Sequence, residues 1–169
     1  MDKLNKNSVS LAGEFAVLSQ LALRGYDANM TLGNTKNVDI LVSNPVNGRM
    51  YKLEVKTNYK SGRNEGGSSK LFGKYVSSWL MGEKHETITD ADLFYCFVNI
   101  GKSTNIFKFY IVPSTVVANY VKEQHKLWLK DRKPVETSLR QFRIGMQGET
   151  YPIPTPYVEK YENNWDFKL

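Results

Sequence analysis

The sequence has little of the chemistry that cysteine and histidine provide, with a single cysteine, Cys96, and two histidines, His85 and His125, among 169 residues. One cysteine excludes an intrachain disulfide, and no Cys/His cluster has the spacing of a zinc site. Both histidines lie in polar, charged runs and are expected at the surface. Cys96 lies in the apolar run DLFYCFVNI and is expected in the core.

Long apolar runs and low-complexity segments are also missing. No stretch approaches the ~18 apolar residues of a membrane span, and the start MDKLNKNSVSLAGEF lacks the apolar centre of a signal peptide. We therefore expect a cytoplasmic protein. The composition, 41% hydrophobic and 24% charged, is typical of a folded chain, and 169 residues predict a single domain over 1–169.

Acidic residues are outnumbered by basic ones, 17 to 23, which gives a formal charge of +6. The excess is concentrated between Arg49 and Lys74, where seven basic residues accompany two glutamates, Glu54 and Glu65. Such a segment is either a solvated surface loop or a surface that faces phosphate groups. Charge alone does not choose between these interpretations.

Periodicity and turn residues predict a mixed α/β fold in the order α-β-β-β-α-β-β-α. Ser8 or Ser10 is expected to cap a first helix that ends at Gly25 and buries the stripe Leu11, Phe15, Leu18 and Ala22. Strands are expected over 26–32, 38–43, 50–57, 92–99, 106–112 and 138–144, and helices over 71–81, from Pro113 onward, and over 157–166 with Trp165 in the core. The polar run 59–70 is expected to be an exposed loop.

The stretch VDILVSNPVNGRMYKLEVKT predicts a hairpin that places charged residues on one face. A turn centred between Val46 and Asn47 sets Asp39 opposite Glu54, with Cβ atoms ~4.5–5.5 Å apart. Because side chains alternate along a strand, Lys56 shares the face of Glu54. The other face carries the apolar residues Val38, Ile40, Val42, Leu53 and Val55.

Two opposed carboxylates require a counter-charge, which either Lys56 or a divalent cation provides. The first interpretation makes the three charges a salt-bridge network on an exposed sheet. Glu14 bears on the choice, because a helical wheel places it within the apolar arc of the first helix. A carboxylate there is either a rim residue bonded to Lys56 or to the backbone, or part of a site.

Glu14 on a helix, Asp39 on one strand and Glu54-Val55-Lys56 on the next together resemble the PD-(D/E)xK nuclease superfamily, whose members include Holliday-junction resolvases. The resemblance covers Val9 to Ile111. It implies a restriction-endonuclease-like three-layer fold with a mixed central β-sheet flanked by helices, an αβββαβ core over about 9–112 and a C-terminal extension over 113–169. Val38 stands where many members have proline.

The resemblance also implies roles for individual residues. Asp39, Glu54 and the backbone carbonyl of Val55 would bind Mg²⁺, with Mn²⁺ as a substitute. Lys56 would orient or activate the attacking water, and Glu14 would hold a second metal, a metal-bound water or Lys56. Thr57 is a further candidate, because some relatives keep a polar catalytic residue near the lysine.

The expected function is therefore a Mg²⁺-dependent nuclease that acts on DNA, with a homodimer as one expected assembly. A catalytically inactive nucleic-acid-binding module that retains the fold, and a subunit active only within a larger complex, are the alternatives. The basic loop supplies four expected contacts to backbone phosphates: Lys60, Arg63, Lys70 and Lys74. Tyr59, Tyr75 and Trp79 either stack on unpaired bases or belong to the core.

Overall fold

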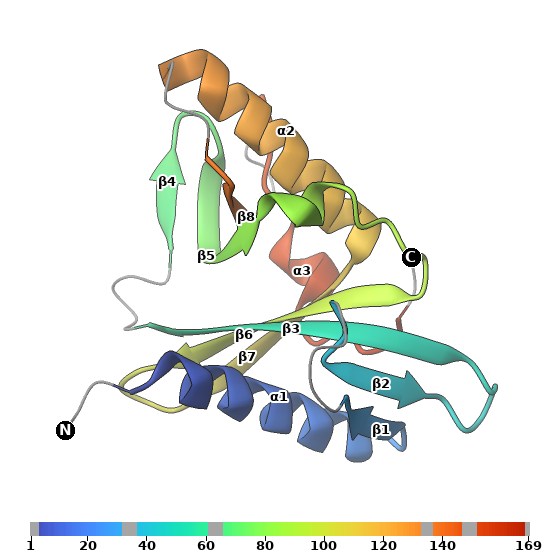
Figure 1. Cartoon of the computed structure of the whole chain (residues 1–169). Coiled ribbons are helices and arrows are strands. Elements are labelled where there is room, and N and C mark those ends of the chain that lie inside the picture. Colours follow the sequence, from blue (N-terminus) through green and yellow to red (C-terminus); the bar gives the residue numbers. More distant parts are fainter. Residues whose placement is uncertain (1–3, 32–36, 61–65, 133–136, 147–151, 168–169) are drawn as a thin grey trace.

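The computed structural model describes residues 4–31, 37–60, 66–132, 137–146 and 152–167 (Figure 1). The N-terminal half contains α1 (Lys6–Ala22), β1 (Asp27–Met30), β2 (Ile40–Ser43), β3 (Met50–Lys60), β4 (Gly67–Ser69), β5 (Gly73–Gly82) and the 3₁₀ helix η2 (Glu83–Glu86). The C-terminal half contains β6 (Leu93–Gly101), β7 (Phe107–Pro113), α2 (Ser114–Arg132), β8 (Leu139–Gly145) and α3 (Val158–Tyr161). No helix in these ranges has the length and apolar character required to cross a membrane.

A central sheet of five strands in the order β1-β2-β3-β6-β7 organises the molecule. The β3–β6 pair is parallel and the other pairs are antiparallel, so the sheet is mixed. In Figure 1, α1 lies along one face, and α2, α3 and a second sheet lie on the other. The predicted fold class, a mixed α/β fold with a central mixed sheet flanked by helices, is confirmed.

The two faces of the central sheet bury different clusters. Toward α1, Val17 and Leu21 pack with residues of β2 and β3: Ile40, Val42, Leu53 and Val55. Cys96 and Trp165 also lie in this cluster, as predicted. On the opposite face the aromatic residues of β6 and β7 pack against β5, β8 and α2: Tyr95, Phe97, Tyr110, Trp79, Phe142, Val117 and Val121.

The second sheet, in the order β4-β5-β8, corrects one predicted element. Residues 71–81 do not form a helix, because β5 covers Gly73–Gly82 and pairs antiparallel with β8. Trp79 and Met81 are buried while Leu80 between them is 71% exposed, which is the alternation of a strand. The expected loop over 59–70 is also partly strand, since β3 extends to Lys60 and β4 covers Gly67–Ser69.

Helix α1 buries a different stripe from the predicted one. Its buried residues are Gly13, Val17 and Leu21, whereas Leu11 and Phe15 are 45% and 56% exposed. The reason is a close approach of helix to strand: a Cβ on Gly13 would lie 1.9 Å from Oγ1 of Thr57 on β3. The close contact at Gly13 therefore determines which face of α1 packs against the sheet, and the hydrophobic periodicity predicted a different face.

The ends of α1 follow capping chemistry. Asn5 is the N-cap, and its side chain accepts a hydrogen bond from the Asn7 amide at 3.0 Å, so the expected caps Ser8 and Ser10 lie inside the helix. Gly25, with a φ of 77°, follows the last turn as predicted.

Candidate active site

The candidate site lies where β2 and β3 separate. The observed register pairs Leu41 with Lys52 and Ser43 with Met50, as predicted, and the pairing ends at Ile40 and Leu53. β3 continues to Lys60 with β6 on its other side. From Glu54 onward, one edge of β3 is no longer paired with β2.

Asp39 occupies the point of separation. It precedes β2, so it does not pair with Glu54 within the ladder, and its own amide donates to the Leu53 carbonyl at 2.8 Å. The Val55 amide donates to Oδ2 of Asp39 at 2.7 Å. A side-chain carboxylate thus replaces the main-chain acceptor that a neighbouring strand would supply, and this bond fixes the position of Asp39.

Glu54 and Lys56 share the face of β3 that points away from α1, as strand alternation predicts. Nζ of Lys56 lies 2.5 Å from Oε1 of Glu54. Glu54 is 3% exposed, and its second oxygen, Oε2, has no hydrogen-bond partner within the described residues. A buried carboxylate with one unused oxygen is costly unless another group binds there.

His85 and Tyr95 extend the cluster, and the prediction that His85 lies at the surface is wrong. His85 is 2% exposed, its Nδ1 lies 2.7 Å from the Tyr95 hydroxyl, and its Nε2 lies 3.9 Å from Oε1 of Glu54. Burial, together with Lys56 and Lys84, lowers the pKa of His85 to about 4. The imidazole is therefore neutral at neutral pH.

The neighbours of the two ring nitrogens favour one tautomer of His85. Burial and the nearby charge of Glu54 raise the pKa of Tyr95, so the phenol keeps its proton. A neutral phenol can donate or accept, so the tautomer follows from the other ring nitrogen: Nε2 faces the Glu54 carboxylate, which favours the ring proton on Nε2 and leaves Nδ1 to accept from the phenol. η2 folds back over β6 to bring the two residues together, and no spacing in the sequence signals this contact.

Glu14 reaches the same region from α1. It is half-buried, and the Ser10 hydroxyl donates to its Oε1 at 3.2 Å. Burial and the charge of Asp39 raise the pKa of Glu14, against the opposing effects of Ser10 and Lys56. Burial also raises the pKa of Asp39, with a contribution from Glu54, although the Val55 amide and Lys56 oppose it.

The site therefore concentrates carboxylates whose charged forms are disfavoured, which is the electrostatic setting of a cation site. In the part of the chain that the structure describes, no three His, Cys, Asp or Glu side chains are grouped closely enough to hold a metal ion by themselves. The residues fit an ion held by two carboxylates, with water and phosphate oxygens completing its shell, as Mg²⁺ prefers. The unused Oε2 of Glu54 is the observation that supports this fit.

A groove of about 930 Å³ adjoins Lys56. It runs between the free edge of β3 and the first turns of α1, and is lined by Leu4, Lys6, Asn7, Val9, Ser10, Val55, Lys56, Thr57, Asn58, Tyr59 and Lys102. None of these described lining residues is acidic, so the groove suits a polyanion. Lys6 and Lys102 were not predicted, because they lie far from Lys56 in the sequence.

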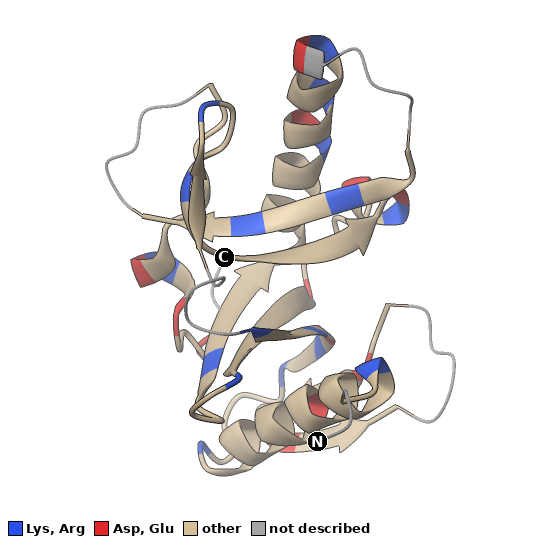
Figure 2. Ribbon diagram, turned by 90° about the vertical axis from the view of Figure 1, so that its left-hand side faces the viewer, with Lys and Arg blue, Asp and Glu red and all other residues tan. Residues whose placement is uncertain are grey.

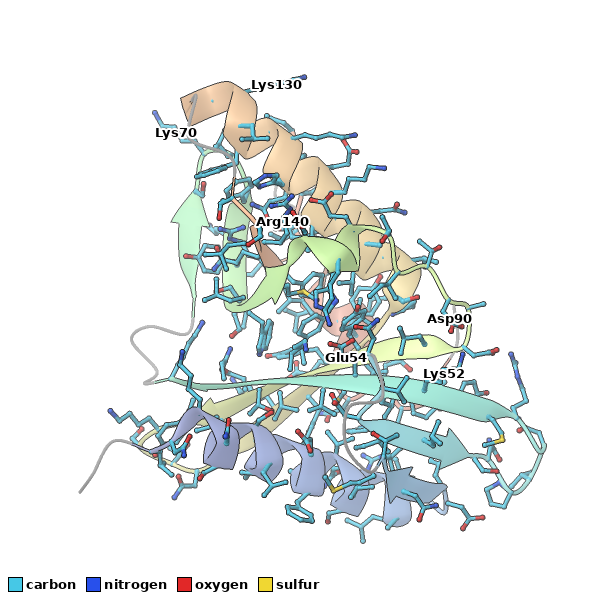
Figure 3. All side chains as sticks on the ribbon, viewed as in Figure 1. Lys52, Glu54, Lys70, Asp90, Lys130 and Arg140 are labelled. Atoms are coloured by element: carbon cyan, nitrogen blue, oxygen red, sulfur yellow. The ribbon has the colours of Figure 1, made fainter. Side chains whose placement is uncertain are left out.

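The predicted phosphate contacts do not gather in this groove. The Lys60 ammonium donates to the Ser78 carbonyl at 2.8 Å. Lys70 and Lys74 are exposed on the second sheet, and Figure 3 places Lys70 at the far end of the molecule from Glu54. Arg63 lies outside the described residues. The hydroxyl of Thr57 is buried against Gly13 and has no hydrogen-bond partner among the described residues.

Comparison with known proteins places the fold. No family model matches the sequence, and no curated protein matches it either. Among solved structures, the chain is similar to a bacterial homing endonuclease, with a TM-score of 0.54 and 14% identity over 96% of this chain and 90% of the other. At this identity the likeness concerns the fold: the chain has the fold of a nuclease over nearly its whole length.

Proposed function

We propose that this protein is a Mg²⁺-dependent endonuclease of the PD-(D/E)xK type that hydrolyses phosphodiester bonds in DNA. The observation that carries the proposal is the buried Glu54, whose carboxylate has one oxygen paired with Lys56 and the other unused, beside Asp39 at the split between two strands. The likeness to a homing endonuclease supports the same activity.

Asp39 and Glu54, with the carbonyl of Val55, would hold Mg²⁺, and Mn²⁺ would substitute. Glu14 would complete the shell or hold a second ion. When bound, the ion lowers the pKa of water and offsets the charge of the phosphate. Without the ion, Asp39 and Glu14 are neighbouring carboxylates whose pKa values are raised, chiefly by burial.

Each protein residue in the proposal has a task that follows from its contacts. The Lys56 ammonium lies between Glu54 and the groove, where it orients the attacking water and stabilises charge that develops on the phosphate. The Val55 amide holds the Asp39 carboxylate in place. His85, hydrogen-bonded to Tyr95, limits the movement of Glu54 and keeps water away from its buried side.

The substrate would bind in the groove beside Lys56. Lys6 and Lys102 would bind phosphates of the DNA backbone on either side of the bond that lies at Lys56. The alternative is a nucleic-acid-binding module without activity. Two observations are consistent with it: Lys56 already pairs with Glu54, and among the described residues no three His, Cys, Asp or Glu side chains are grouped to hold a metal ion.

The test is cleavage of supercoiled, linear, single-stranded and branched DNA with Mg²⁺ or Mn²⁺ by the wild type and by Asp39→Asn. The asparagine keeps an oxygen that accepts from the Val55 amide but lacks the charge, so the fold survives and cleavage falls by about 10²-fold or more. Binding, measured without cleavage in Ca²⁺, remains. Equal cleavage by wild type and variant would identify a contaminating nuclease, and binding without any cleavage would favour the inactive module.

A further inference from the structure

A second cavity, of about 900 Å³, lies between the second sheet and α2. None of the residues assigned above to the chemistry lines it. Its described walls come from the β4–β5 turn, β5, β8 and the last turns of α2, and they carry aromatic rings (Phe72, Tyr75, His125, Trp128) and cations (Lys70, Arg140, Arg143) beside one acid, Asp131. Figure 2 shows basic residues spread over this sheet.

Arg143 presents a fixed guanidinium to this cavity. Its Cζ lies 4.3 Å from the ring centre of Phe72 and 5.6 Å from that of Tyr75, so the group is held against aromatic faces. Nη2 donates to Gln141. Nε and Nη1 have no hydrogen-bond partner among the described residues. The guanidinium thus keeps two donors, on different edges of the group, that can bind the oxygens of an anion.

The α2 wall of the cavity contributes a buried oxygen that has no hydrogen-bond partner among the described residues. Gln124 lines the cavity at 5% exposure, and its Oε1 has no partner within the described ranges. The hydroxyl of Tyr120, one turn earlier, interacts with Arg143, which lowers the pKa of this tyrosine against the larger effect of burial. A buried amide oxygen with no partner is rare in native proteins and points to a donor that is missing from the site.

Aromatic stacking surfaces stand beside this amide. His125, which is 5% exposed and not at the surface as the sequence predicts, stacks on Trp128 with ring centres 5.6 Å apart and an angle of 26°. Trp128 is only partly buried, so one part of the stack faces the cavity. A planar ring system that enters the cavity meets a stacking surface, an amide that reads hydrogen-bonding edges, and two cations.

We propose that this cavity binds one nucleotide. The base stacks on Trp128 and hydrogen-bonds to Gln124, as unpaired bases do when a protein reads them. The phosphate binds to Arg143 and Lys70. A nucleotide of this kind comes either from an unpaired position in the nucleic-acid substrate, in which case the inference rests on the proposed function, or from a free mononucleotide.

The cavity adjoins the candidate active site through η2. His85 of this short helix faces Glu54, and Glu86 forms an ion pair with Arg140 in the cavity wall. Arg140 is therefore already neutralised, which leaves Arg143 and Lys70 as the cations for the ligand. Figure 3 shows Arg140 between Lys70 at the far end of the molecule and Glu54 near its centre.

Tryptophan fluorescence tests the proposal directly. Trp79 and Trp165 are 3% and 4% exposed, so quenching by a bound base reports on Trp128. The probes are dAMP and two oligonucleotides that contain 2-aminopurine, one at an unpaired position and one within a full duplex. We expect quenching by dAMP or by the unpaired probe, and loss of the signal in Trp128→Phe.

Two variants with similar shapes test the assignment of contacts. Gln124→Leu removes the unused amide oxygen, and Arg143→Lys keeps the charge but not the planar guanidinium with its several donors. Each should weaken nucleotide binding about tenfold or more. Gln124→Leu should leave the melting temperature unchanged or higher. Binding of dAMP alone would assign the site to a free nucleotide, and binding of the unpaired probe would assign it to the strand.

Failure of this proposal is distinguishable from failure of the proposed nuclease. Lys56→Met should leave quenching unchanged, so a protein that does not cleave DNA but shows Trp128 quenching keeps the nucleotide site. A protein that cleaves DNA but shows no quenching with any probe, or equal binding in Gln124→Leu, Arg143→Lys and wild type, would overturn it.

Discussion

Nζ of Lys56 lies 2.5 Å from Oε1 of Glu54, while Oε2 of the same buried carboxylate has no partner among the described residues. One oxygen is neutralised by the protein, and the other is left for a group that the protein does not supply. The proposed function rests on this relationship, because a solvated salt bridge on a sheet face would leave neither oxygen buried and unused.

Lys56→Met should lower the free energy of unfolding by about 1–3 kcal/mol, because it leaves Glu54 buried without its partner. Lys52→Met is the matched control on the same strand and face. Lys52 pairs with Asp90, but both side chains are about two-fifths exposed, so its loss should cost less than ~1 kcal/mol. Denaturant unfolding measures both values. Similar losses in the two variants would mean that Lys56 is an ordinary surface residue.

Mg²⁺ should stabilise the folded protein, because the ion binds carboxylates that exist as a cluster only in the folded state. At 100 times the dissociation constant the gain is about 2.7 kcal/mol, which corresponds to a rise in melting temperature of roughly 5–10 °C for a chain of this size. NaCl at the same ionic strength controls for screening, and EDTA should reverse the rise. A rise that persists in Asp39→Asn would place the ion elsewhere.

His85 should make stability depend on pH in the acidic range. Its pKa is about 4 in the folded protein, against an ordinary value of 6.5, so the unfolded chain binds a proton first as the pH falls. The stabilisation is complete above about pH 6.5 and is lost as the pH falls toward 4. Asp39 and Glu14 have raised pKa values, so the folded protein binds their protons first, and their contribution to stability increases as the pH falls.

The difference between wild type and His85→Gln isolates this contribution. Unfolding free energies measured between pH 7 and pH 4 should fall less steeply in His85→Gln than in the wild type. Identical slopes would show that the imidazole is not held neutral by its surroundings.

Gly13→Ala should lower stability by about 1–3 kcal/mol, although alanine favours helices by ~1 kcal/mol. The new Cβ would lie 1.9 Å from Oγ1 of Thr57, so α1 must move away from β3 and carry Glu14 with it. Cleavage should fall as well. Gly82→Ala is the control, because no atom lies within 4 Å of its added Cβ. Equal melting temperatures for Gly13→Ala and wild type would contradict this close packing.

Turn residues and apolar alternation in the sequence predicted the elements whose contacts are local, above all the β2–β3 hairpin. The Asn44–Gly48 turn and the apolar alternation fixed the register of β2 against β3, and thereby the face that Glu54 and Lys56 share. The parallel pairing of β3 with β6 joins segments that are distant in the sequence, so the two strands were predicted but their pairing was not.

The errors arose where tertiary contacts overrode local patterns. A strand with Ser77-Ser78 and glycines at both ends was predicted as a helix, because its partner, β8, lies far along the chain. The buried face of α1 was set by Gly13 against Thr57 and not by its larger apolar residues. His85 and His125 sit in polar runs, and only the packing of η2 and α2 buries them.

The most direct measurement is the rate at which Glu54→Gln nicks supercoiled DNA over a range of Mg²⁺ concentrations, beside the wild type. The glutamine has the same shape but lacks the charge that pairs with Lys56 and would hold the ion. The account predicts that the wild type nicks DNA only when Mg²⁺ or Mn²⁺ is present and that the variant is slower by about 10²-fold or more at every concentration. Nicking by Glu54→Gln at the wild-type rate, or by the wild type in excess EDTA, would contradict it.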